Sequence, residues 1–145
     1  MEKRIADIEA VREEAQSLVA RLAPKSAGAT LITLNGELGA GKTTFTQEVA
    51  RALGVTEQVT SPTFVLEKIY ELQSQDSFSK LVHIDAYRLN GGSELRALGF
   101  EALTADTKNL IIIEWPERVA DALPVADVSI TLIPESDGSR TMTYA

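Results

Sequence analysis

Residues 30–45 read TLITLNGELGAGKTTF, an apolar run that leads through a glycine-rich turn into a helical pattern. The run at 30–35 is β-branched and bounded by glycine, which predicts a buried strand. From Lys42 onward, apolar residues recur at helical spacing, and Gly54 suits the position just after a helix. The stretch therefore predicts a strand and a helix that are joined by a glycine loop.

The spacing Gly36-x-x-x-x-Gly41-Lys42-Thr43 within that loop is the Walker A pattern. Glycines let backbone N–H groups point inward around an anion, and the following helix adds its positive end. In such loops the lysine reaches the β- and γ-phosphates and the Ser/Thr hydroxyl binds Mg²⁺. A glycine turn that binds nothing is disfavoured, because motif and context agree. The expected ATP-binding residues are Gly36, Glu37, Leu38, Gly39, Ala40, Gly41, Lys42, Thr43 and Thr44.

Two further apolar strands end in carboxylates, LVHID at Asp85 and LIIIE at Glu114. In a parallel sheet, the carboxyl ends of the strands lie along the edge where ligands bind. Both carboxylates are therefore expected to face the same Mg²⁺ as the loop. The alternative for either one alone is a solvated charge at a strand end.

The remaining pattern predicts a single α/β domain over residues 1–145, similar to P-loop NTPases, with a mainly parallel sheet flanked by helices. A helix is expected at 5–22, strands at 64–72, 81–87 and 109–115, and a helix at 116–123 with proline first. Residues 127–144 predict an antiparallel hairpin with its turn at 137–138 and its second strand at the sheet edge.

Composition narrows the possible functions. The 145 residues carry a net charge of -7, which argues against broad unassisted binding to nucleic acid. The absence of cysteine excludes disulfides, thiolate metal sites and cysteine nucleophiles. Neither a membrane-length apolar stretch nor a signal-peptide pattern is present, so a cytoplasmic protein without membrane contact is expected.

Other readings of these motifs fit less well. LNGGSE at 89–94 is like an ABC-transporter signature, but that signature works only within a much larger domain. No N-K-x-D motif is present for guanine, which favours adenine. A small P-loop kinase stays an alternative, although its lid would hold only Arg88 and Arg96. His83 is expected to be packed or hydrogen-bonded rather than catalytic, and Trp115 is a potential reporter beside the site.

Five segments taken together carry a family resemblance: GELGAGKTTF, VTSPTFVL, HIDAYRL, ELRALGF and IEWPE. In order and spacing they resemble the TsaE (YjeE) family, the small P-loop ATPases of bacterial tRNA N6-threonylcarbamoyladenosine (t6A) synthesis. The resemblance covers roughly residues 30–124, and the DGSR turn extends it weakly.

The resemblance implies an Mg²⁺-dependent ATPase that is weak alone and acts with TsaB and TsaD, meeting tRNA only through that complex. It implies resetting or regulation of TsaD rather than transfer of the threonylcarbamoyl group. A nucleotide-gated binding module with incidental hydrolysis stays open as the alternative. By motif match, Thr43 and Glu114 are the Mg²⁺ ligands, and Lys42 and Asp85 are catalytic, with Asp85 near the metal or the attacking water. The residues of a switch-like loop would be Thr60, Ser61, Pro62 and Thr63.

Overall fold

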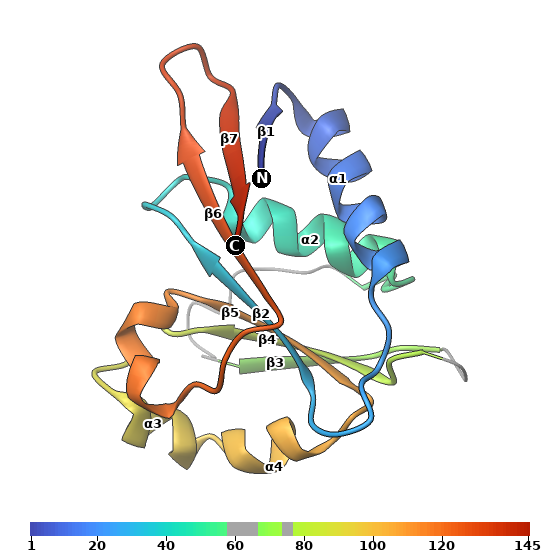
Figure 1. Cartoon of the computed structure of the whole chain (residues 1–145), viewed down its shortest axis with the longest axis vertical. Coiled ribbons are helices and arrows are strands. Elements are labelled where there is room, and N and C mark those ends of the chain that lie inside the picture. The colour runs from blue at the N-terminus through green and yellow to red at the C-terminus, as the bar shows by residue number, and fades with distance from the viewer. Residues whose placement is uncertain (58–66, 74–76) are drawn as a thin grey trace.

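The centre of the fold is a seven-stranded sheet (Figure 1), seen in a computed structural model that describes residues 1–57, 67–73 and 77–145. Its strands are β1 (Glu2–Ile5), β2 (Thr30–Asn35), β3 (Glu67–Glu71), β4 (Lys80–Asp85), β5 (Asn109–Glu114), β6 (Val128–Pro134) and β7 (Arg140–Tyr144). They lie in the order β1-β7-β6-β2-β5-β4-β3. The neighbours β6, β2, β5 and β4 are parallel, and β3, β7 and β1 add antiparallel strands. The predicted α/β class with a parallel core and a C-terminal hairpin is thereby confirmed.

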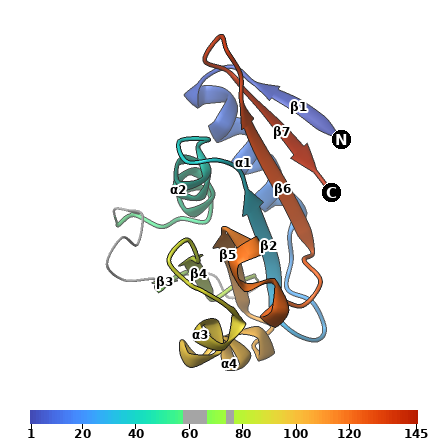
Figure 2. The ribbon, with the colours of Figure 1, turned by 90° about the vertical axis from the view of Figure 1, so that its left-hand side faces the viewer.

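Helices cover both faces of the sheet (Figure 2). One face carries α1 (Ile8–Arg21) and α2 (Lys42–Ala52), and the other carries α3 (Gly92–Ala97), α4 (Phe100–Ala105) and the 3₁₀ helix η1 (Pro116–Ala122). Successive strand residues point to opposite faces. Accordingly, Ile32 of β2 packs in the core under α1 and α2, whereas its neighbour Leu31 packs with α3, α4 and η1.

The N-terminal segment differs from its prediction. The expected helix at 5–22 is a strand followed by a shorter helix, because Asp7 caps α1 by accepting a hydrogen bond from the Ala10 amide at 2.9 Å. Ile5 matched the helical spacing but is buried in β1. Since β1 pairs with β7, the expectation that the second hairpin strand is an edge is also wrong.

Two strands end earlier than their patterns indicate. The strand expected at 81–87 ends at Asp85, and the one expected at 109–115 ends at Glu114. The next residue, Trp115, has a φ of 59° and turns the chain into η1, which is a 3₁₀ rather than an α-helix. The first residues of the strand predicted at 64–72 lie outside the described part of the chain.

The topology brings the glycine loop and the two strand-end carboxylates to one edge of the sheet. Because β2, β4 and β5 are parallel neighbours, their carboxyl ends lie side by side, with Asp85 opposite Glu114 in the register. The glycine loop leaves β2 at this edge and enters α2. No helix within residues 1–57, 67–73 and 77–145 is long and apolar enough to cross a membrane.

Candidate functional site

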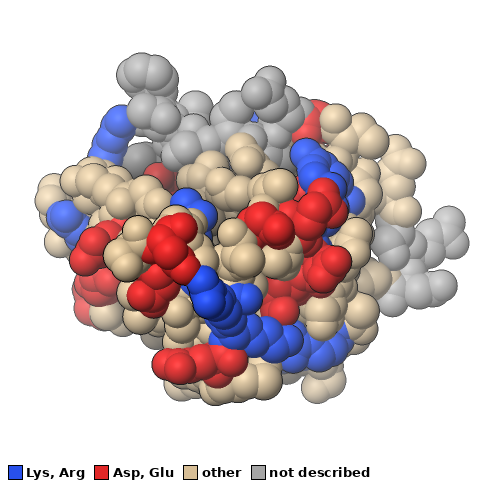
Figure 3. Space-filling view, turned by 90° about the horizontal axis from the view of Figure 1, so that it is seen from above, with Lys and Arg blue, Asp and Glu red and all other residues tan. Residues whose placement is uncertain are grey.

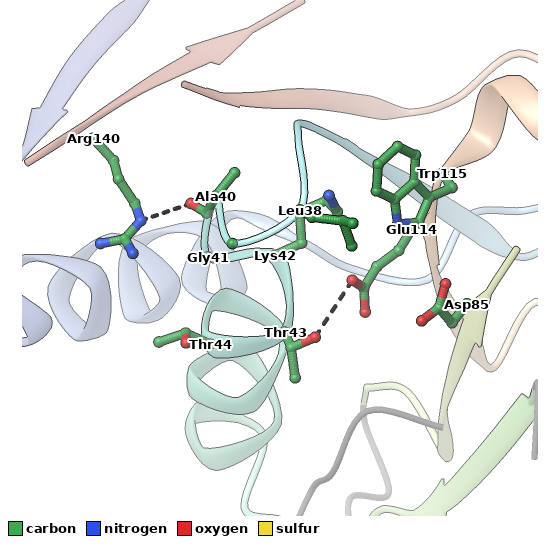
Figure 4. A pocket seen from close by; sticks show the side chains of 11 residues that line it. Leu38, Ala40, Gly41, Lys42, Thr43, Thr44, Asp85, Glu114, Trp115 and Arg140 are labelled. Atoms are coloured by element: carbon green, nitrogen blue, oxygen red, sulfur yellow. Dashed lines mark hydrogen bonds between the residues drawn. The ribbon is translucent and has the colours of Figure 1, made fainter. Parts of the chain in front are cut away.

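A pocket of about 250 Å³ opens at the carboxyl edge of the parallel strands (Figure 4). Its wall combines the loop and first turn of α2, two strand ends and one residue of the hairpin. The lining residues are Leu38, Gly39, Ala40, Gly41, Lys42, Thr43, Thr44, Asp85, Glu114, Trp115 and Arg140.

Two loop glycines are required by the geometry. Gly36 has a φ of 150°, and a Cβ there would lie 2.7 Å from the carbonyl oxygen of Leu132 on β6. Gly41 has a φ of 101°, in the left-handed region that favours glycine, and forms the N-cap of α2. Its carbonyl accepts the first helical hydrogen bond from the Phe45 amide at 2.9 Å. The loop therefore passes close to β6 and presents the N-terminus of α2 to the pocket.

Lys42 is folded back over the loop. Its Nζ donates hydrogen bonds to the carbonyl oxygens of Gly36 and Glu37 and lies 4.0 Å from the centroid of the Trp115 ring. Burial lowers the pKa of Lys42, and the carboxylates of Glu114, Asp85 and Glu117 oppose that shift. The ammonium is thus a desolvated cation held at the pocket wall, where its attraction to an anion is stronger than in water.

Glu114 links the loop to the neighbouring strand β4. One carboxylate oxygen, Oε1, lies 3.5 Å from the Thr43 hydroxyl, and the other, Oε2, accepts a hydrogen bond from His83 Nε2 at 2.5 Å. His83 is fully buried and Glu114 is 3% exposed. The expectation that His83 is packed and hydrogen-bonded is confirmed, and its partner is the carboxylate that sequence reasoning assigned to Mg²⁺.

The oxygens of Thr43 and Glu114 are suitable Mg²⁺ ligands, because this hard cation prefers hydroxyl and carboxylate donors. Asp85 lines the same pocket from the end of β4, and its Oδ1 accepts a hydrogen bond from the Tyr87 amide at 3.0 Å. Within the described residues, no three His, Cys, Asp or Glu side chains form a metal cluster by themselves. Mg²⁺ is usually held by one or two carboxylates together with substrate phosphates, and this donor set fits that arrangement.

Aromatic and cationic groups alternate in a row that starts at the pocket wall. The Trp115 ring contacts both the Lys42 ammonium and the Tyr87 ring, whose centroid is 4.9 Å away. Arg118 in turn lies 5.2 Å from the Tyr87 centroid. Of the described non-glycine residues, only Trp115 has a positive φ, and this turn is what directs its ring over Lys42.

Most of the residues predicted for the site come together here. Gly36 and Glu37 contribute carbonyl oxygens to Lys42 instead of lining the cavity. The predicted switch-like loop, residues 60–63, lies outside the described part of the chain. Arg140 was not singled out from the sequence, and only the quoted DGSR turn pointed toward it. Its Nε donates a hydrogen bond to the Ala40 carbonyl at 2.7 Å.

Comparison with known proteins identifies relatives over most of the chain. The sequence model of the family described as "Threonylcarbamoyl adenosine biosynthesis protein TsaE" matches residues 6–142. The TsaE protein of Treponema pallidum is 38% identical over 80% of this chain and 82% of its own length. That of Streptomyces coelicolor is 42% identical over 71% of this chain and 68% of its own length.

A solved structure agrees with these relatives. The crystal structure of Bacillus subtilis YdiB superposes with a TM-score of 0.75 at 27% identity, covering 99% of this chain and 83% of that one. The chain belongs to the TsaE family and is a protein of tRNA threonylcarbamoyladenosine biosynthesis.

Proposed function

We propose that this member of the TsaE family binds ATP together with Mg²⁺ at the glycine loop and hydrolyses it slowly. The observation that carries the proposal is the convergence of the loop, Lys42 and the Thr43–Glu114 pair in one pocket. A polyphosphate needs backbone N–H donors, a cation and oxygen ligands for its metal, and this pocket offers all three.

Each part of the pocket has a role in this proposal. The amides of residues 39–44 hold the phosphates, and Lys42 exchanges its bonds to the Gly36 and Glu37 carbonyls for bonds to β- and γ-oxygens. Thr43 and Glu114 would hold Mg²⁺, which when bound neutralises charge on the β- and γ-phosphates. Asp85 lines the same pocket. In this proposal its carboxylate lies near the metal or orients the attacking water.

Nucleotide turnover then serves t6A synthesis. We propose that the chain acts on TsaD within a TsaB–TsaD complex, resetting or regulating it between cycles, and does not transfer the threonylcarbamoyl group itself. Family membership supports this role, and the net charge of -7 is suited to a protein that meets tRNA only through its partners. On the face shown in Figure 3, one stripe of basic side chains is bordered by acidic ones, and the other basic side chains are scattered between acidic and uncharged residues. The cytoplasm, where tRNA is modified, is the proposed location.

Replacement of Lys42 tests the ATPase. Lys42→Ala should abolish hydrolysis and weaken ATP binding, because the variant lacks the cation that meets the β- and γ-phosphates. Circular dichroism should show an unchanged fold. ATP should bind more tightly than GTP in a calorimetric titration with Mg²⁺. Normal hydrolysis by folded Lys42→Ala protein would refute the assignment of this loop.

The need for hydrolysis requires a separate experiment with TsaB, TsaD and tRNA. If turnover resets TsaD, a non-hydrolysable ATP analogue should permit one round of modification but not several. Several rounds with the analogue would instead show a nucleotide-gated binding module whose hydrolysis is incidental. Phosphate transfer from ATP to an acceptor other than water would show a kinase.

A further inference from the structure

Arg140 contacts the glycine loop from β7, a strand that is separated from β2 by β6 in the sheet. It is the first residue of β7, where it lies opposite Pro134 of β6 and Ile5 of β1. From there its Nε donates to the Ala40 carbonyl at 2.7 Å. The guanidinium lies directly against Gly41, because a Cβ at that glycine would be 2.8 Å from Nε. The hairpin is thereby attached to the loop by one side chain.

The Ala40 bond uses only one of the donors of this side chain. A guanidinium carries five N–H donors in a fixed fork, so four remain on its two terminal nitrogens. Within the described part of the chain, these nitrogens have no hydrogen-bond acceptor and no carboxylate partner. The side chain is only partly exposed and lines the same pocket as Thr44. Its free donors are therefore available to an anion in the pocket.

The position of Arg140 in the pocket indicates which phosphate of a nucleotide it would contact. Thr43 and Glu114 lie on one side of the loop, and Arg140 lies on the opposite side beyond Ala40 and Gly41 (Figure 4). In P-loop proteins the metal bridges the β- and γ-phosphates. A triphosphate bound with its γ end at Glu114 would therefore extend its α end toward Thr44 and Arg140, which line the same pocket.

We infer that Arg140 binds the α-phosphate of the nucleotide through its terminal nitrogens, a role that rests on the proposed binding of ATP. The fork of arginine suits two phosphate oxygens, which a lysine meets only as a point charge. The electrostatics favour the same role. Among the described residues, the pocket holds two carboxylates, Asp85 and Glu114, and two cations, Lys42 and Arg140. Both carboxylates are on the γ side, so Arg140 supplies the positive charge at the other end.

Calorimetric titrations of Arg140→Met with Mg²⁺ and either ATP or GTP test this inference. Affinity should fall about ten- to a hundred-fold for both nucleotides, since charge-assisted hydrogen bonds to a phosphate group are lost. Arg140→Lys, which keeps the charge without the fork, should recover part of the loss. Arg4→Met is the matched control. It removes the same charge from neighbouring β1, where Arg4 pairs with exposed Asp137 outside the pocket.

Two further readouts separate phosphate binding from mere support of the loop. Wild type should discriminate between the two diastereomers of ATP with sulfur on the α-phosphate, and Arg140→Met should discriminate less. In hydrolysis, Arg140→Met should raise KM and leave kcat within about two-fold, because an α contact is the same in ground and transition states.

Equal ATP affinity in wild type and Arg140→Met would overturn the inference. A loss restricted to ATP and absent for GTP would also overturn it, because the contact would then be to the base. An undiminished preference between the diastereomers would reduce Arg140 to a support for the loop. If wild type itself bound no nucleotide, the proposed ATP binding would fail first. Thermal unfolding of each variant without ligand checks that the hairpin stays folded.

Discussion

Replacing His83 by leucine should destabilise the fold through Glu114. His83 Nε2 is the hydrogen-bond donor to Glu114 Oε2 at 2.5 Å, and both side chains are almost completely inaccessible to solvent. Leucine would leave a buried carboxylate without this donor. A hydrogen bond to a charged group contributes about 1.5–3 kcal/mol, and leaving a buried charge unpaired costs about 3–5 kcal/mol. We therefore expect His83→Leu to lower the free energy of unfolding by about 2–4 kcal/mol.

Two companion variants isolate the cause of that loss. His83→Gln keeps an N–H donor and should recover part of the stability. Glu114→Gln in the His83→Leu background removes the uncompensated charge. The double variant should therefore lose less free energy of unfolding than the two single variants lose together. Urea unfolding followed by far-ultraviolet circular dichroism measures wild type, the single variants His83→Leu, His83→Gln and Glu114→Gln, and the double variant.

The same hydrogen bond also orients the site. With Oε2 held by His83, Oε1 is directed toward the Thr43 hydroxyl. His83→Leu should therefore reduce the extra thermal stabilisation that Mg²⁺ gives to the ATP complex, and His83→Gln should reduce it less. Strictly additive stabilities in the double-mutant cycle, with an unchanged effect of Mg²⁺, would refute the reasoning.

Three further predictions concern single residues. Glu114→Gln should retain ATP binding without Mg²⁺ but show a smaller Mg²⁺-dependent thermal shift; an equal shift in both proteins would make Asp85 the carboxylate to test. The emission of Trp115, the only tryptophan, should change when ATP and Mg²⁺ are added, because its ring contacts Lys42. Burial raises the pKa of Glu67 above 4.5, so ionisation costs stability as the pH rises through that pKa. Glu67→Gln should therefore be more stable than wild type at pH 7 and lose this advantage below about pH 4 in urea unfolding.

Local patterns were sufficient for the parallel core and for much of the pocket. A run such as residues 109–114 has no stable position except between two other strands, and parallel strands bring their carboxyl ends to one edge. The pairing of Asp85 with Glu114 in register follows from that rule. The Walker A spacing likewise predicts the conformation of the loop. Its glycines stand where the backbone has a positive φ and passes close to neighbouring atoms, and a Cβ would not fit there.

Long-range pairing limited the rest of the prediction. Ile5 and Ile8 have helical spacing, yet a strand-to-helix boundary separates them, and only the capping residue Asp7 marked it. The burial of Ile5 depends on β7, which lies more than 130 residues away. The approach of Arg140 to Ala40 depends on the register of the same hairpin, which local sequence periodicity does not predict.

The distribution of cations along the pocket bears on why hydrolysis should be slow. In the transition state of phosphoryl transfer, negative charge is spread over the γ-phosphate oxygens, and an arginine that stabilises this charge raises the rate by orders of magnitude. Two cations line the pocket in the described residues. In the proposed binding mode, Arg140 would lie on the α side and only Lys42 would reach the γ end. Lys42 is moreover flanked there by Asp85 and Glu114, whose charges oppose those of the phosphate. The arrangement therefore favours tight holding of the nucleotide over its cleavage. A partner that brings one more positive charge to the γ end would change the rate without any change in the loop.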